Sequence, residues 1–363
     1  MMQANDGARD TQLAGSDVQP AYARAGVDIA AGARAVELMG AAVRSTYGPE
    51  VLAGIGAFGG LFDASSLQGL RNPVLVASTD GVGTKTKVAA RLGRWNSLGQ
   101  DIVNHCVNDI LVQGARPLFF LDYVATSRLD AEQIAAVVGG CATACREAGC
   151  ALLGGETAEM PGVYQPGEVD LVGTIVGVVE RANIVDGCRI QPGDALLGLP
   201  SAGLHTNGFS LARQALEGQD WLENRTELGC SIGDALLAVH RSYLAPVRTL
   251  QAAGVDVRGL AHITGGGFID NLPRILPQDT AAEIRRGAWP ELPIFELIQR
   301  LGGITDDEMF HVFNMGLGML VVVPQDHVAA ALIALPGDAH LVGEITAGDG
   351  GAGRRRVAIL HDR

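Results

Sequence analysis

Apolar and polar positions follow two different periods along the first half of the chain. Apolar residues recur at helical spacing in residues 25–47 and on one face of residues 97–114, which predicts two amphipathic helices. The second helix also carries a polar face, where Asp101, His105 and Asn108 lie at steps of four and three. Apolar runs rich in β-branched and aromatic residues predict strands at residues 74–78, 117–125, 150–153 and 169–179, and residues 131–148 predict a third helix.

The second half shows a similar order of elements. A strand at residues 195–199 leads into a loop rich in glycine and small polar residues, and a helix begins at Phe209. Strands return at residues 319–323 and 340–345. Since 363 residues exceed what one hydrophobic core usually holds, we expect two domains. Polar residues and a turn place the boundary near residue 181, so the domains are expected at 21–181 and 182–363, after a disordered tail at 1–20.

Composition and charge narrow the possible partners. Acidic residues outnumber basic ones by 40 to 27, and the resulting charge of −13 repels the phosphate backbone that a general nucleic-acid binder must neutralise. The N-terminus lacks the apolar core of a signal peptide and no run is long enough to span a bilayer, so we expect a cytoplasmic protein without a membrane partner. The six cysteines show no metal-binding or disulfide spacing and are expected to be mostly buried free thiols.

The first predicted strand ends in a loop suited to phosphate and metal. Asp80 is followed by Gly81, Gly83, Thr84 and Lys85. Glycines let backbone amides approach phosphate oxygens, a lysine adds positive charge, and a carboxylate can hold Mg²⁺. This is not the pattern of a P-loop, and Asp-Gly on its own is as often an ordinary turn.

Two further carboxylates lie at the ends of predicted elements. Asp109 ends the polar face of the helix at 97–114, and Glu156 follows Gly154 and Gly155 after a strand. Asn108, beside Asp109, and the two glycines are expected to contact the nucleotide. Each of the two carboxylates alone could be a surface or capping group. Together with Asp80 they predict a site for magnesium and a triphosphate, because a parallel or mixed sheet can bring such ends together.

The second half contributes histidines beside glycines. His205 and His262 each follow a strand-like run, a placement that suits proton transfer or phosphate contact, although each could also be structural. Asn207 could contact a substrate or cap the helix at Phe209. The glycines that include Gly265 and Gly266 suit close approach to a phosphate-bearing ligand. His105 and His311 are expected to be structural.

These segments resemble one family, the phosphoribosylformylglycinamidine cyclo-ligases, also called aminoimidazole ribonucleotide (AIR) synthetases. The resemblance runs from about Tyr22 to the C-terminus, and VNDILVQGARPLFFLDY and GGETAEMPGVY are its most specific segments. It also covers AGVDIAAG, GIGAFGGLF, STDGVGTKTKVA, SAGLHTNGFSLAR, HITGGGFIDNLPRILP and FNMGLGM. The Asp-Gly-x-Gly-Thr-Lys loop alone would reach only the wider superfamily, which includes thiamine-monophosphate kinase.

The resemblance implies an α/β N-terminal domain and an α+β C-terminal domain, in a homodimer whose strands form a β-barrel at the interface. It implies a ligase of purine biosynthesis, which uses ATP and Mg²⁺ to close the imidazole ring of formylglycinamidine ribonucleotide and releases ADP and phosphate.

Residue by residue, the resemblance gives Asp80, Asp109 and Glu156 as metal and triphosphate positions, Lys85 as a phosphate contact, and His205 and His262 as residues near catalysis. Gly59 and Gly60 belong to a segment that resembles a loop covering the nucleotide. The family often has lysine at the positions of Ala23 and Gly40, so contacts made by those lysines are not expected here.

Overall fold

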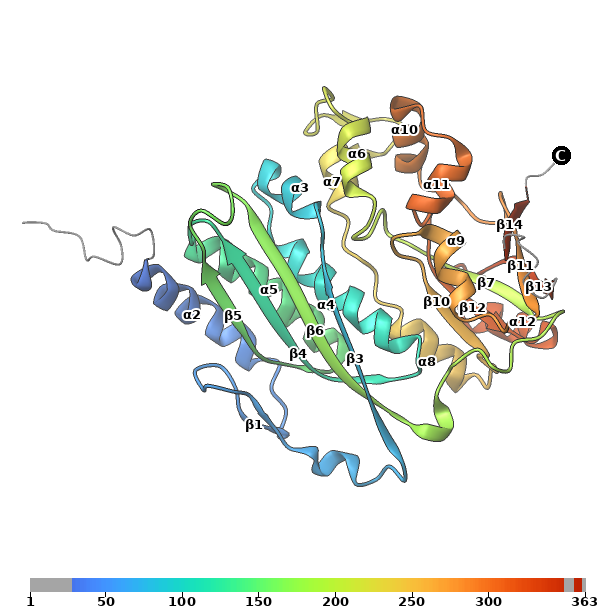
Figure 1. Cartoon of the computed structure of the whole chain (residues 1–363), viewed down its shortest axis with the longest axis horizontal. Helices are drawn as coiled ribbons and strands as arrows, with labels where there is room; N and C mark the ends of the chain where they lie inside the picture. Colours follow the sequence, from blue (N-terminus) through green and yellow to red (C-terminus); the bar gives the residue numbers. More distant parts are fainter. Residues whose placement is uncertain (1–27, 349–355, 361–363) are drawn as a thin grey trace, which may run out of the picture.

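The fold is that of a computed structural model, which describes residues 28–348 and 356–360. It contains two main sheets that share no strand, one built from residues 73–180 and the other from residues 195–360 (Figure 1). The expected tail at residues 1–20 and the first residues of the helix predicted at 25–47 lie outside the described residues.

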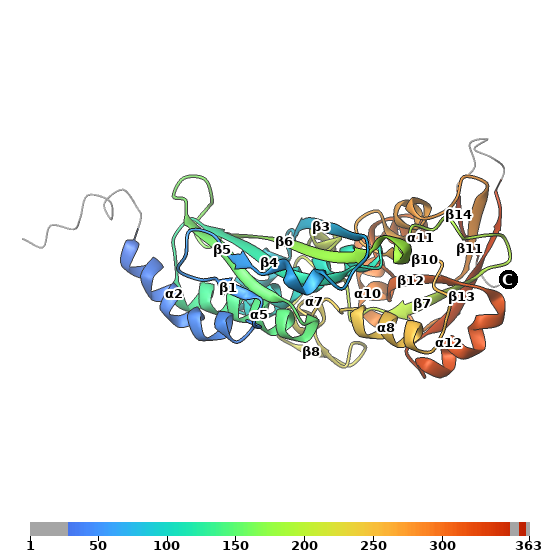
Figure 2. The same cartoon turned by 90° about the horizontal axis from the view of Figure 1, so that it is seen from below.

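The first sheet has four strands in the order β3-β6-β4-β5. β4 runs parallel to β5 and antiparallel to β6, so the sheet is mixed. Helices cover one of its faces: α4 packs on β3 and β6, and Figure 2 shows α2 and α5 on the same side. The elements of this half are α2 (Ile29–Arg44), β1 (Val51–Ala53), β2 (Leu61–Phe62), η1 (Ala64–Leu67), β3 (Pro73–Gly81), α3 (Lys85–Leu92), α4 (Asn96–Leu111), β4 (Arg116–Thr126), α5 (Ala131–Ala148), β5 (Ala151–Glu159) and β6 (Val169–Glu180).

Local sequence explains how the helices of this half begin and pack. Asp130 caps α5 by accepting a hydrogen bond from the Gln133 amide, and Gly149 ends the helix in the left-handed conformation. Where α4 crosses α5, a Cβ on Gly99 would lie 1.9 Å from the Val137 carbonyl oxygen. Glycine is therefore required for the close contact that holds α4, and the polar residues it carries, against the sheet.

The second sheet has six strands in the order β10-β12-β7-β13-β11-β14. Its pairs are antiparallel except for β11 with β14, and β12 is buried along its whole length. The elements of this half are η2 (Arg181–Asn183), β7 (Ala195–Pro200), α6 (Phe209–Ala215), β8 (Asn224–Arg225), β9 (Cys230–Ser231), α7 (Ile232–Leu236), α8 (Leu244–Ala252), β10 (Gly259–His262), α9 (Gly267–Asn271), η3 (Leu272–Arg274), β11 (Thr280–Arg285), α10 (Pro293–Gly302), α11 (Asp306–Val312), β12 (Leu317–Val323), η4 (Gln325–His327), α12 (Val328–Ala334), β13 (His340–Ala347) and β14 (Val357–Leu360).

Each predicted strand and helix that falls on described residues is present, with shifted ends. Neither main sheet closes on itself within the described residues, so the single chain contains no barrel of the kind that the resemblance implies. All six cysteines are free, and four of them are buried, as predicted. No described helix is both long and apolar enough to cross a bilayer.

Candidate active site

Two carboxylates meet a buried histidine where the halves of the chain join. Asp80, near the end of β3, accepts a hydrogen bond at Oδ2 from Nε2 of His105, at 2.9 Å. The same nitrogen lies 3.6 Å from Oδ2 of Asp109, four residues along α4. The Asp80 side chain is 45% exposed and the Asp109 side chain 24%, whereas the His105 side chain is 3% exposed. The carboxylates therefore face solvent in front of a buried imidazole.

Behind the carboxylates, a series of hydrogen bonds links three buried histidines. Thr206 joins His105 to His240, and His240 contacts His262 directly. Nδ1 of His105 lies 2.6 Å from Oγ1 of Thr206, and that oxygen lies 3.3 Å from Nδ1 of His240. Nε2 of His240 lies 3.0 Å from Nε2 of His262, which contacts Oδ1 of Asp109 through Nδ1 at 2.9 Å. These side chains come from α4, the loop after β7, the loop before α8, and β10. One polar chain thus crosses the junction between the two halves.

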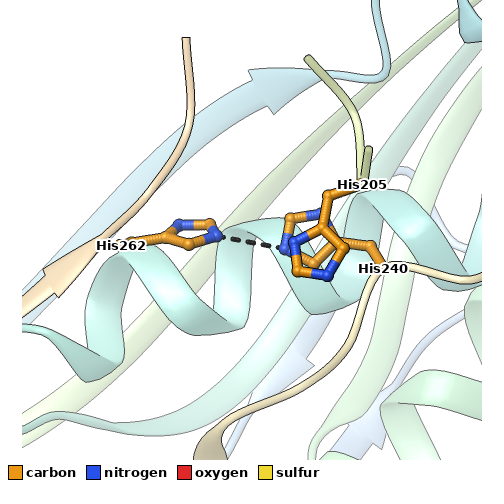
Figure 3. Close-up of side chains that lie close together, drawn as sticks. All are labelled: His205, His240 and His262. Carbon is orange, nitrogen blue, oxygen red and sulfur yellow. Dashed lines mark hydrogen bonds between the residues drawn. The ribbon is translucent and has the colours of Figure 1, made fainter. Parts of the chain in front are cut away.

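His205 completes the cluster and has a strained backbone. Its φ of 63° lies in the left-handed region, which is uncommon for residues other than glycine and is found often at functional sites. Its ring stacks on that of His240, with centroids 4.0 Å apart and an angle of 21° between the planes (Figure 3). Nε2 accepts hydrogen bonds from the amides of Ala202 and Arg241, while Nδ1 is buried without a hydrogen-bond partner among the described residues.

Burial and charge act in opposite directions on these groups. Burial lowers the pKa of His105, but the hydrogen bond to Asp80 and the charge of Asp109 raise it by more than burial lowers it. The net pKa therefore lies above the ordinary value. For His205, His240 and His262 burial dominates and the pKa is lowered. Burial raises the pKa values of both carboxylates, yet their contacts with the histidines lower them overall. The shifts therefore favour ionised forms of both carboxylates, the protonated form of His105 and the neutral forms of the other three imidazoles.

A separate cavity lies under the glycine-rich loop at residues 54–60. It has a volume of about 460 Å³ and is lined by that loop, including Gly59 and Gly60, and by residues of β4, β5 and β6, among them Gly154, Gly155 and Glu156. A Cβ on Gly60 would lie 2.3 Å from the Leu153 side chain, so the loop needs glycine to sit this close to β5. A second cavity of about 300 Å³ shares part of this lining and reaches α2. Both volumes suit a small ligand.

Comparison with known proteins identifies the family. The model of the AIR synthase related protein N-terminal domain matches residues 63–179, and that of the C-terminal domain matches residues 191–355. A relative from Geobacillus thermodenitrificans, named phosphoribosylformylglycinamidine cyclo-ligase, is 51% identical over 336 residues, which cover 91% of this chain and 96% of the relative. A relative of the same name from Myxococcus xanthus is 53% identical over 337 residues, covering 91% and 97%. This chain belongs to the phosphoribosylformylglycinamidine cyclo-ligase family.

Solved structures support the same fold. The hydrogenase maturation protein HypE in complex with ATP aligns with a TM-score of 0.64 and 21% identity, covering 91% of both chains. Thiamine-monophosphate kinase from Stenotrophomonas maltophilia aligns with a TM-score of 0.64 and 18% identity, covering 90% of this chain and 95% of the kinase. The fold implied by the family resemblance, an α/β first half and an α+β second half, is therefore confirmed.

The structure brings together two of the three expected metal positions of this cyclo-ligase family member, but not the third. Asp80 aligns across the sheet with Gly155, and Gly81 aligns with Glu156. Because side chains alternate along strands, Glu156 points to the face opposite Asp80, three strand spacings away, about 14 Å. Asp80 and Asp109 lie on the helix-covered face, whereas Glu156 lines the glycine-rich cavity. The prediction that the three carboxylates converge is wrong within one chain.

Lys85 does not face a ligand. Its side chain has no exposed surface, and Nζ lies 2.8 Å from Oδ2 of Asp101 in α4. Nζ also donates hydrogen bonds to the carbonyls of His205 and Ala238, at 3.0 and 2.8 Å. All three donors of the ammonium are therefore used inside the protein. The expected phosphate contact is wrong for this conformation, and the lysine instead holds the loop that carries His205.

Asn108, predicted to contact the nucleotide, is also fully buried. Its amide nitrogen donates to the Arg241 carbonyl at 2.8 Å, and its Oδ1 accepts from the Tyr243 amide at 2.9 Å. The polar face predicted for this helix therefore binds the loop before α8. The ligand role predicted for Asn108 does not fit these contacts.

The loops of the second half give a mixed outcome. Asn207 does not cap α6, since Gly208 occupies the cap position; its Nδ2 donates weakly to Thr206. A Cβ on Gly265 would lie 3.1 Å from Oδ1 of Asn207, so the two residues are neighbours. Gly265 is exposed and Asn207 is half-buried. Gly266 has a φ of 94°, which requires glycine for the turn into α9. Their contacts with a ligand stay predictions.

His105 and His311 were both expected to be structural, but only His311 lies outside the histidine cluster. His105, expected to be structural, contacts both carboxylates and is part of the cluster. His311 lies on the surface, paired with Asp270. His240 and Thr206 were missed by sequence reasoning, because His240 sits beside no glycine or motif that would distinguish it from a structural histidine.

Proposed function

We propose that this chain is a ligase that closes the imidazole ring of formylglycinamidine ribonucleotide, with ATP converted to ADP and phosphate, in de novo purine biosynthesis. The supporting observation is the 51–53% identity to relatives named phosphoribosylformylglycinamidine cyclo-ligase, over 91% of the chain. ATP as co-substrate also accords with HypE, whose solved structure of the same fold contains ATP.

The chemistry explains why such an enzyme needs ATP. The formamide carbonyl is a poor electrophile, and phosphorylation of its oxygen turns that oxygen into a good leaving group. The amidine nitrogen that attacks is part of the same molecule, so the enzyme mainly has to hold the reactive conformation. Charge on the transferring phosphoryl group must also be neutralised.

Asp80 and Asp109 are the residues that would hold Mg²⁺. Both are ionised carboxylates with partly exposed oxygens, which is the donor type that Mg²⁺ prefers. Oδ1 of Asp80 accepts the Gly81 amide and Oδ2 of Asp109 accepts the Ser78 hydroxyl, so both carboxylates are held in fixed orientations. When bound, the ion would neutralise triphosphate charge beside the amides of Gly81, Gly83 and Thr84.

His205 and His262 are the candidates for proton transfer during ring closure. His262 contacts Asp109 directly, which places a neutral imidazole next to the proposed phosphate site. The cavity lined by Gly59, Gly60 and Glu156 lies on the other face of the sheet, so we assign it to a second phosphate-bearing ligand. ATP and the ribonucleotide substrate both carry phosphate.

We also propose that the chain acts as a homodimer that packs through the open face of the first sheet. Helices cover the opposite face, and apolar side chains on or near the open face are more than half exposed, namely Leu52, Leu61, Leu75 and Val163. Pairing of two such faces would account for the interface barrel that the family resemblance implies. Sedimentation equilibrium would test this, because Leu75→Asp should give a monomer whereas Ile333→Asp, at an exposed site on α12, should not.

Two further expectations follow from the same proposal. The division into domains near residue 181 accords with the absence of a shared strand between the two main sheets. A cytoplasmic location accords with charged, phosphorylated substrates.

The test is a turnover assay with ATP, Mg²⁺ and formylglycinamidine ribonucleotide, read as substrate-dependent ADP and as the aromatic amine product. Asp80→Asn should lower kcat by at least about 100-fold with unchanged circular dichroism, because it removes a metal-binding charge. Glu223→Gln, an exposed carboxylate elsewhere, is the control and should keep full activity. ADP production without the aromatic amine would reject ring closure and favour a kinase, and normal activity in Asp80→Asn would show that Asp80 is not the metal ligand.

A further inference from the structure

The second cavity, of about 300 Å³, lies between α2, α5 and the outer strand β5, and we call it the α2 cavity. It is on the helix-covered side of the first sheet, where Figure 2 shows α2 and α5. Its apolar lining comes from successive turns of α2, from α5, from β5 and from the glycine-rich loop, namely Val36, Met39, Val43, Val138, Leu152 and Ile55. The cavity therefore has apolar walls from the helices and from the sheet.

One buried carboxyl group faces this cavity without a partner. Asp122, on β4, is 9% exposed and lines the α2 cavity. Because side chains alternate along β4, its carboxyl lies on the helix-covered face with the fully buried Phe120 and Val124. No side chain or amide of another described residue donates a hydrogen bond to it, and only its own amide opposes the effect of burial on its pKa. A ligand that supplies an N–H donor would remove the cost of this unpaired group.

The neighbouring strand leaves the Asp122 carboxyl accessible. Gly155 lies opposite Asp122 on β5, and a Cβ at Gly155 would be 2.4 Å from Oδ1 of Asp122. Any side chain at position 155 would therefore occupy the space in front of the carboxyl. Gly154 and Gly155 both line the α2 cavity, and these glycines keep the carboxyl open to it.

The lining excludes some ligand groups and favours one class. Among the described residues that line the α2 cavity there is no lysine, arginine or histidine, whereas Asp122 and Glu156 contribute carboxyl groups. A phosphate group would therefore be repelled. Apolar walls suit an aromatic ring, and the thioether of Met39 packs favourably against such rings. The unpaired carboxyl requires an N–H donor on the edge of that ring. A nitrogen heterocycle such as a purine base meets these conditions.

The cavity under residues 54–60 provides room for the rest of such a ligand. The two cavities share five lining residues, Ile55, Asp122, Gly154, Gly155 and Glu156. The loop over the larger cavity contains four glycines, which let backbone amides approach a phosphate group. About 300 Å³ is at the lower end of ligand pockets and suits a base, while about 460 Å³ suits a sugar with phosphate. The joined cavities thus match the two ends of a nucleotide.

We propose that the α2 cavity binds the base of a purine nucleotide, with Asp122 accepting a hydrogen bond from an N–H group of the base, and with the ribose and phosphate extending under residues 54–60. The nucleotide is either the ATP of the proposed reaction or a second purine nucleotide, because both carry the same base chemistry. The proposal rests on the proposed function only for ATP as one of these sources, and binding can be measured without turnover.

Tryptophan substitutions on α2 test whether the cavity has to be open. Val36 lines the cavity and is 45% exposed, so Val36→Trp can fill the cavity without displacing core residues. Leu38→Trp is the matched control, because Leu38 is 42% exposed on the same helix and does not line the cavity. Calorimetry of the full chain with adenosine and with AMP should give an affinity at least about 10-fold weaker for Val36→Trp and an unchanged affinity for Leu38→Trp.

Replacement of Asp122 tests the hydrogen bond. Asp122→Leu keeps a similar volume without an acceptor and should weaken adenosine binding by about 10-fold. Asp122→Asn keeps a carbonyl acceptor and should bind adenosine more tightly than Asp122→Leu does. Circular dichroism checks that each variant is folded. If Asp122→Leu does not fold, the pair of tryptophan variants and the Met39 signal described next still decide the question.

Met39 reports occupancy of the cavity directly. In ¹³C-methyl methionine spectra of the full chain, with the Met39 signal assigned by Met39→Leu, the ring current of the base should shift this signal when adenosine or AMP is added. An unshifted Met39 signal at millimolar adenosine and AMP would overturn the proposal and leave the cavity as a packing defect. Equal adenosine affinities of Val36→Trp and Leu38→Trp, or of Asp122→Leu and the unchanged protein, would also overturn it.

Competition separates the two sources of the base. Displacement of AMP by ATP at the Met39 signal would identify the base as that of the co-substrate, whereas simultaneous binding of both would identify a second nucleotide. Either result supports a base site in the α2 cavity. Absence of ring-closing turnover in the unchanged protein would reject the proposed function, while the Met39 spectra would still decide whether the cavity binds a base.

Discussion

Replacement of Lys85 by methionine tests whether this residue holds the protein together or binds phosphate. Lys85 and Asp101 form an ion pair at 2.8 Å with neither side chain exposed. Burial lowers the pKa of Lys85 and raises that of Asp101, and each shift is opposed by the charge of the partner. Methionine fills nearly the same space without the charge, so Lys85→Met leaves the Asp101 carboxylate buried and uncompensated.

The expected cost is large because the pair is fully enclosed. Removal of one partner of a buried ion pair destabilises a protein by about 3–5 kcal/mol. Adding Asp101→Asn removes the uncompensated charge while keeping an acceptor for the His240 amide. The carbonyls of His205 and Ala238 still lose their donor, at about 1 kcal/mol each. The double variant should therefore be destabilised by roughly 2 kcal/mol and be more stable than Lys85→Met alone.

The assay is urea unfolding followed by circular dichroism, together with ATP binding by calorimetry. Lys87→Met is the matched control, because its pair with Glu168 is part-exposed and such pairs contribute about 0–1 kcal/mol. A phosphate contact would give the opposite pattern. If Lys85→Met keeps its urea midpoint but loses ATP affinity, and Asp101→Asn restores nothing, the structural role assigned to Lys85 is refuted.

Two further substitutions test other parts of the structure. Burial raises the pKa of Asp122 to about 7, so the folded state loses stability as the pH rises from about 4 to 7. Asp122→Asn should remove that loss, and the variant should gain up to about 4 kcal/mol of stability at pH 8 but little at pH 4. Urea unfolding at both pH values measures the difference. An equal effect at both pH values would show that Asp122 titrates normally. Gly99→Ala should destabilise by several kcal/mol or prevent folding, because its Cβ meets the α5 backbone, whereas Gly139→Ala, with open space around its Cβ, should be tolerated in a thermal-melt comparison. A Gly99→Ala melting temperature equal to that of the Gly139→Ala protein would contradict the close helix crossing.

Local pattern was sufficient for most elements of the first half. Strand β3 and helix α5 could be predicted because period-two and period-3.6 apolar patterns reflect burial on one face of an element. In the second half, α10, α11 and β11 were not predicted. The helix α10 has an apolar face, Pro293 at its first position and Gly303 after its last, so the sequence carried signals for this helix that the prediction did not use.

For the site, too, local sequence predicted some features and not others. Residue type and local spacing were enough to predict the family, the glycine-rich loops, and the positions of Asp80 and Asp109 at the ends of their elements. They also indicated that α4 has a polar face, but not what that face binds. Asn104 and Asn108 find their partners at His240 and Arg241, more than 130 residues away.

Tertiary structure alone decided which groups meet. Asp80 and Glu156 lie on the two outer strands of one four-stranded sheet, and a register difference of one residue also places them on opposite faces. Lys85 follows a phosphate-binding type of loop, yet the halves of the chain close over it and pair it with Asp101. In each case the outcome depends on strand register and on packing between distant segments, which residue type and local spacing do not encode.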